Sequence, residues 1–200
     1  MKKFLNGCVV ACLSLLCFSC GNGSGSDSTD AAKDSNAAKM DSTKNDSTKM
    51  AMPASVSKAD ATFAVNTADA GMTEIQAGQL AEKMGVAKDV KDYGAMMVKD
   101  HTEAADKLKT LAASKNITLP MTLSSDAQKT IDDLQKKQGK DFDKAYIDQM
   151  ISDHKKVISA FEDESKNGSD ADIRAFADNT LTTLRHHLDE AEKCHKMMKK

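Results

Sequence analysis

The chain has 200 residues and a net charge of −2, and its basic and acidic side chains are interspersed along the sequence. This pattern is typical of solvated helix surfaces and excludes the basic patch that a nucleic-acid-binding protein requires. The absence of Trp and the aromatic fraction of 4% argue against a sugar-binding face.

The first 19 residues have the pattern of an export signal. Two lysines precede an apolar run over residues 9–18, which is too short to span a bilayer as a permanent anchor. Cys20 follows a small residue and precedes a polar stretch, so we interpret residues 1–19 as a lipoprotein signal peptide and Cys20 as the lipidated residue. Cys17 occupies the position where such signals usually carry an aliphatic residue. The pattern predicts a bacterial lipoprotein whose remaining chain lies outside the inner membrane.

Residues 20–57 contain almost nothing that a core could bury. Ser, Thr, Asp, Lys, Asn, Gly and Ala dominate this stretch. Because such a composition cannot offset the entropy lost on ordering, we expect a disordered tether between the lipid on Cys20 and the rest of the chain.

Residues 58–200 are predicted to form one all-α domain. This part has a single proline, Pro120, is rich in helix-forming residues, and shows no sustained strand-like alternation. Turn and cap residues, with Ser169 as the predicted cap of the last helix, divide it into four long helices and one short one. The expected ranges are 59–85, 87–116, 126–137 for the short helix, 141–166, and 170 to nearly the end.

The connection between the second and third long helices, residues 117–140, is much longer than the other two. Short loops make the flanking helices antiparallel, whereas a connection of this length can cross the bundle and leave the second and third long helices parallel. The sequence therefore predicts a ferritin-like four-helix bundle, with a long crossover that contains a short helix between helices two and three.

Four residue types recur in the same order and at the same spacing on the second and third long helices. The first set is Tyr93, Met97, Asp100 and His101, and the second is Tyr146, Met150, Asp153 and His154. Uncommon residue types rarely agree at four positions by chance. We therefore expect the two helices to present matching side chains at the same depth of the bundle.

Helical periodicity directs a histidine from each of three long helices into the core. His101 and His154 lie on apolar stripes, and His187 points inward while its neighbour His186 points outward. The first long helix offers Glu74 on a face of small residues. Folding the helices back about their turns brings these four side chains to neighbouring levels.

Histidine, carboxylate and methionine side chains that converge from four helices are typical of a metal site in a bundle. Copper, iron or zinc suits such a donor set, and the methionines favour copper. The predicted ligands are His101, His154, His187 and Glu74, with Met97, Met150, Asp100 and Asp153 as auxiliary ligands or hydrogen-bond partners.

The same residues also fit a purely structural role. Buried His and Asp can form a hydrogen-bonded network, and inward methionines are ordinary core residues. A di-iron site needs paired Glu-x-x-His motifs, and the one match, at residues 192–195, has no partner. No catalytic residue is predicted, since the chain shows no nucleophile–base arrangement and no phosphate loop. Cys194, the one cysteine besides Cys20 after signal removal, is expected to be buried.

Several strings in the domain resemble the bacterial ferritin-like domain-of-unknown-function family 4142, often described as "predicted outer membrane protein". They are Phe63 and Glu74, residues 97–101, Leu119 with Pro120, residues 141–146, residues 152–154 and residues 183–188. This resemblance implies a four-helix ferritin-like fold and an envelope location, without an established reaction or ligand set. Together with the lipoprotein signal, it leads us to expect an outer-membrane lipoprotein that faces the periplasm or the cell surface. Residues 150–154 also resemble the Met-Ile-x-His-His signature of a second ferritin-like family linked to copper, with Asp153 in place of its first His.

Two functions are compatible with these observations. The first is an envelope lipoprotein that binds a transition metal within the bundle and serves metal handling or stress tolerance. The second is a non-catalytic structural or protein-interaction module of the outer membrane, whose polar core sets the register of the helices and whose outer faces meet an unidentified protein.

Overall fold

The structure, a computed structural model, describes residues 27–44 and 56–198. All regular secondary structure in this part of the chain is helical, as predicted. The helices are α1 (Ser28–Lys44), α2 (Lys58–Met84), α3 (Lys88–Ser114), α4 (Ser125–Gln135), α5 (Gly139–Asn167) and α6 (Ala171–Met197). Among the described residues, no helix combines the length and apolar character needed to cross a membrane.

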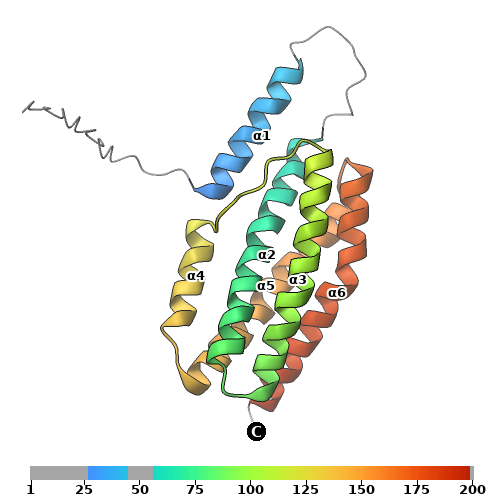
Figure 1. Cartoon of the computed structure of the whole chain (residues 1–200). Coiled ribbons are helices and arrows are strands. Elements are labelled where there is room, and N and C mark those ends of the chain that lie inside the picture. Colours follow the sequence, from blue (N-terminus) through green and yellow to red (C-terminus); the bar gives the residue numbers. More distant parts are fainter. Residues whose placement is uncertain (1–26, 45–55, 199–200) are drawn as a thin grey trace, which may run out of the picture.

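The four long helices α2, α3, α5 and α6 lie side by side (Figure 1). α2 packs mainly on α3 and α5 mainly on α6, and the two hairpins meet through α2 with α5 and α3 with α6. In Figure 1, α3 ends at the top and α5 begins at the bottom, so both run in the same direction. The α3–α5 connection, residues 115–138, returns along the side of the bundle and includes α4, which packs on α2 and α5.

Each hairpin turn is held by an aspartate from the other hairpin. Asp143, in the second turn of α5, accepts hydrogen bonds from the backbone N–H groups of Val86 and Ala87 at 3.0 and 2.8 Å. Asp60, in the first turn of α2, accepts two such bonds from the α5–α6 turn, also at 3.0 and 2.8 Å. Both aspartates are buried. These carboxylates satisfy backbone donors that a tight turn between helices leaves open.

Hydrophobic side chains form two clusters along the bundle axis. One contains Met97 and Tyr146 and the other contains Phe63 and Phe161. On every long helix a buried polar residue separates the two clusters in sequence. These residues are Glu74 on α2, His101 on α3, His154 on α5 and His187 on α6. The core is therefore divided by a polar layer.

Two glycines bring α2 and α3 into close contact beside that layer. A Cβ atom added at Gly78 would lie 2.8 Å from the carbonyl oxygen of Gly94, and one added at Gly94 would lie 2.8 Å from the carbonyl oxygen of Gly78. Gly71, one turn before Glu74 on α2, has no atom within 4 Å of its added Cβ. The helices thus touch at one level and leave space at another.

This contrast predicts opposite effects of alanine at the glycines of α2 and α3. Gly71→Ala is expected to raise the free energy of unfolding by about 0.5–1 kcal/mol, because the helix loses a flexible residue without a clash. Gly78→Ala and Gly94→Ala are expected to lower it by about 1–3 kcal/mol, since the backbones must separate. Urea denaturation of the three variants measures this, and equal stabilisation of all three would contradict the close approach.

The prediction of a disordered tether over residues 20–57 is wrong for α1. This helix begins after Asp27, whose carboxylate accepts a hydrogen bond from the backbone N–H of Thr29 at 3.0 Å. It packs on α2, and its Asn36 side chain pairs with the backbone N–H and C=O of Thr118 in the α3–α5 connection, at 2.7 and 3.0 Å. Polar contacts of this kind leave no apolar periodicity in the sequence. The predicted signal peptide and Cys20 lie outside the described residues.

The other predicted boundaries differ from the structure by a few residues. The N-cap of α6 is Asp170, not Ser169, because the Asp170 carboxylate accepts hydrogen bonds from the backbone N–H groups of Asp172 and Ile173. Gly139, with φ of 57°, begins α5. Cys194 is buried, as predicted.

Candidate metal centre

Three histidines from three helices meet in the polar layer. His101, His154 and His187 are 7%, 0% and 1% exposed, and one ring nitrogen of each lies within 4.8 Å of the other two. The rings of His101 and His154 have their centroids 5.9 Å apart, so the repeated histidines face each other as predicted. His187 completes the group from α6.

One ring nitrogen of His154 is hydrogen-bonded to the backbone. Its Nδ1 lies 2.9 Å from the carbonyl oxygen of Met150, one turn earlier on α5. A carbonyl oxygen can only accept, so Nδ1 carries the proton in this contact and Nε2 carries the lone pair of the neutral ring.

His187 is oriented in the same way by a carboxylate. Its Nε2 lies 3.1 Å from Oδ2 of Asp100 on α3. Burial opposes ionisation of Asp100, but the hydrogen bonds from His187 and Lys99 outweigh it and lower the pKa of this carboxyl group. An ionised carboxylate accepts hydrogen bonds, so Nε2 of His187 is the donor and Nδ1 carries the lone pair.

The two lone-pair nitrogens face each other. His154 Nε2 and His187 Nδ1 are 3.4 Å apart. Neutral imidazoles in these tautomers have no proton to place between the two atoms, so neither nitrogen is satisfied by the other. A cation or an additional proton is needed to make this contact favourable.

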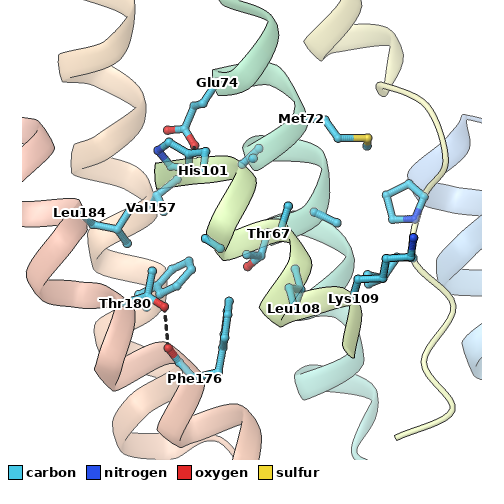
Figure 2. A pocket seen from close by; sticks show the side chains of 18 of the residues that line it. Thr67, Met72, Glu74, His101, Leu108, Lys109, Val157, Phe176, Thr180 and Leu184 are labelled. Carbon is cyan, nitrogen blue, oxygen red and sulfur yellow. Dashed lines mark hydrogen bonds and ion pairs between the residues drawn. The ribbon is translucent and has the colours of Figure 1, made fainter. Parts of the chain in front are cut away.

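His101 lies against the carboxyl group of Glu74. Nδ1 of His101 is 3.2 Å from Oε2 of Glu74, whose Oε1 is 3.6 Å from Nδ1 of His154. Figure 2 shows the Glu74 side chain reaching from α2 to the His101 ring. Nε2 of His101 and Oε1 of Glu74 are buried without a hydrogen-bond partner. Two further polar atoms of the layer are therefore open to a ligand.

Burial keeps the histidines neutral at physiological pH. Loss of solvation, with smaller repulsion from the other histidines, lowers the pKa of His101 to about 3. Loss of solvation lowers the pKa of His154 to about 4 and also lowers that of His187. Neutral imidazole is the form that coordinates metal ions. Burial, with repulsion from Asp153, raises the pKa of Glu74 to about 8.

The residues predicted as auxiliary ligands or hydrogen-bond partners do not all lie at the histidines. Asp100 contacts His187, as described, whereas Asp153 accepts a hydrogen bond from the Gln149 side chain and stays partly exposed. Met97 and Met150 are fully buried in the hydrophobic cluster next to the layer. The structure thus brings the three histidines, Glu74 and Asp100 together and leaves Asp153 outside the group.

A tyrosine layer lies beside the histidine layer. Tyr93 and Tyr146, the other aromatic pair of the repeat, have ring centroids 6.0 Å apart, and both hydroxyl groups are buried without a partner. The repeat therefore predicted two facing pairs. The sequence did not reveal that Met150 contributes its backbone carbonyl to the site, because periodicity carries no information on backbone acceptors.

Comparison with known families places the chain. A family model described as "Domain of unknown function (DUF4142)" matches residues 45–194. The chain belongs to this family. No curated protein and no solved structure matches it significantly. The match covers α2, α3, α5 and α6 as far as residue 194, and with them the whole histidine layer, and α1 precedes it.

Proposed function

We propose that this protein is an envelope lipoprotein whose ferritin-like bundle binds one transition-metal ion at His101, His154 and His187. Support for the envelope location comes from the signal-like residues before Cys20. Support for the ferritin-like fold comes from two antiparallel hairpins joined by a long connection, with α3 and α5 running in the same direction.

The observation that carries the metal proposal is the pair of facing nitrogens. Zinc holds imidazole nitrogens at about 2.0–2.1 Å in tetrahedral geometry, which places two of them about 3.4 Å apart. His154 Nε2 and His187 Nδ1 have this separation. An ion between them replaces an unfavourable contact of two lone pairs with two bonds.

The surroundings of the histidines also suit a metal site. Histidines that bind metals usually have their second nitrogen held by a carboxylate or a backbone carbonyl. Glu74, Met150 and Asp100 are placed to do this for His101, His154 and His187 respectively. Three nitrogen donors suit zinc, copper or iron. The carboxyl group of Glu74 then holds His101 in place, and its free Oε1 offers a further oxygen.

The full-length protein, purified in detergent without a histidine tag, is expected to contain one equivalent of zinc, copper or iron by elemental mass spectrometry. His101→Ala and His187→Ala are expected to reduce the metal to background. His186→Ala is the matched control, because His186 is exposed on the same helix and should keep the metal. A free ion at 100 times its Kd should stabilise the fold by about 2.7 kcal/mol.

Two outcomes would contradict the proposal. The first is a wild-type protein that stays metal-free after incubation with each ion, with no change of melting temperature. The second is equal metal content in His186→Ala and His187→Ala. Either result would favour the structural or protein-interaction role, in which the histidine layer sets the register of the helices.

A further inference from the structure

A cavity of about 280 Å³ extends from the polar layer toward the end of the bundle at which α3 ends. Its walls come from α2, α3, α5, α6 and the α3–α5 connection. In Figure 2, Glu74 and His101 lie at one end, Val157 and Leu184 form one side, and Phe176 lies at the other end.

The cavity exists because small residues line the inner faces of α2 and α3. These residues are Ala68, Ala70 and Gly71 on α2 and Ala104 and Ala105 on α3. The direction in which Gly71 would carry a Cβ is open, with no atom within 4 Å. The close contact at Gly78 and Gly94 fixes the helix separation, so the small residues two to three turns away cannot fill the space between the helices.

The wall is mainly hydrophobic and one end is polar. Leu108, Phe161 and Leu184 are among the buried apolar residues that line the cavity. Oε1 of Glu74 and Nε2 of His101 belong to lining residues, and both atoms are buried without a hydrogen-bond partner. The cavity therefore offers apolar surface along its length and ends at two polar side chains, each with one atom that has no hydrogen-bond partner.

We infer that this cavity binds a compact, neutral molecule with an apolar, ring-sized body and one hydrogen-bonding end, such as an aryl alcohol, whose polar end contacts Glu74 or His101. The size follows from volume, since an apolar cavity of about 150 Å³ accommodates benzene, and this one is roughly twice as large. The neutral end follows from burial, because a charged group in an apolar cavity loses its solvation.

The inference does not depend on a bound metal. The apolar wall of the cavity lies outside the three histidines, so it is present whether or not they hold an ion. The test is therefore made on metal-free protein in the presence of chelator, so that failure of the metal proposal and failure of this one are separate results.

The probes are 2-naphthol and naphthalene-2-sulfonate, which share the same two rings and differ in the charge of the polar end. Because the chain has no Trp, the probe fluorescence is read without interference from that residue. The full-length wild-type protein should bind 2-naphthol with one saturable site and bind the sulfonate at least tenfold more weakly. Gly71→Leu should weaken 2-naphthol binding at least tenfold by filling the cavity.

Gln79→Leu is the control, because it adds the same side chain to the exposed face of α2 and should leave the affinity unchanged. Circular dichroism checks the fold, and Ala105→Leu fills the cavity from α3 if Gly71→Leu fails to fold. No saturable binding of 2-naphthol, tighter binding of the sulfonate, or unchanged binding in a folded cavity-filling variant would each overturn the inference.

Discussion

Replacing Asp60 or Asp143 by alanine is expected to lower the free energy of unfolding by about 3–5 kcal/mol. Each carboxylate is buried and accepts two backbone hydrogen bonds from the turn of the opposite hairpin. Bonds to a charged acceptor contribute about 1.5–3 kcal/mol each, and the variant leaves two buried donors without a partner. Thermal denaturation should show a decrease of roughly 2–4 °C per kcal/mol in a domain of this size.

The matched control is Asp89→Ala. Asp89, like Asp60, lies in the first turn of a long helix, but its side chain is exposed, so its loss should cost about 0.3–1 kcal/mol through the helix dipole alone. Asp60→Asn and Asp143→Asn keep one acceptor oxygen. Their loss of unfolding free energy should lie between that of the alanine variants at the same positions and that of Asp89→Ala. If Asp60→Ala were no more destabilising than Asp89→Ala, the turns would not depend on these carboxylates.

The metal-free site is expected to favour the folded state most strongly near pH 6.5. The pKa values of His101 and His154 fall from 6.5 to about 3 and about 4, so the unfolded chain binds more protons below pH 6.5 and stability is lost on acidification. The pKa of Glu74 rises from 4.5 to about 8, so the folded chain holds the extra proton between these values and stability is lost as the pH rises.

Between pH 4.5 and 6.5 the two effects oppose each other. The two histidines change the stability in one direction and the single carboxyl group changes it in the other. Within the site, the free energy of unfolding therefore falls by a net amount of about 1.4 kcal/mol for each pH unit of acidification. Above pH 6.5 the histidines no longer contribute, so within the site the effect of Glu74 reverses the slope. Glu164, whose pKa burial raises to about 7, acts in the same direction as Glu74. The lowered pKa of His187 steepens the acid side.

Glu74→Gln isolates the carboxyl contribution. Relative to wild type, this variant should gain stability by up to about 1.4 kcal/mol per pH unit between pH 4.5 and 8, because glutamine has no proton to lose. Urea denaturation at pH 5, 6.5 and 8 with chelator measures the difference. Glu103→Gln, at an exposed position of α3, is the control and should show no such trend. A difference between Glu74→Gln and wild type that does not change with pH would contradict the buried neutral carboxyl group.

The long helices could be predicted because their signals are local. Gly85 and Gly168 follow the last residues of α2 and α5, and the Ser124 side chain caps α4. α1 could not be predicted in this way. Its contacts depend on Thr118, far away in the sequence, and no periodic apolar face marks it.

The sequence predicted which residue of each long helix points into the site, but not which hydrogen-bond partner each histidine has. The repeated spacing identified His101 and His154 as facing residues, and periodicity separated inward His187 from outward His186. The sequence could not distinguish Asp100 from Asp153, because the repeat treats them alike. Only Asp100 lies opposite a histidine of another helix, since α6 passes α3 and its His187 reaches that carboxylate.

The weak attachment of α1 sets an order of local unfolding. Within the described part of this helix, Ala32 is the one hydrophobic residue that is buried, and Met40 packs partly buried against the cluster that contains Phe63. Docking of α1 therefore removes little apolar surface from water. Elements with few buried apolar contacts open at low free energy while the core stays intact. α1 can therefore detach from the α3–α5 connection without disturbing the histidine layer. When it does, the backbone groups of Thr118 exchange their partner for water, and the surface next to the cavity wall at Leu119 and Pro120 becomes accessible.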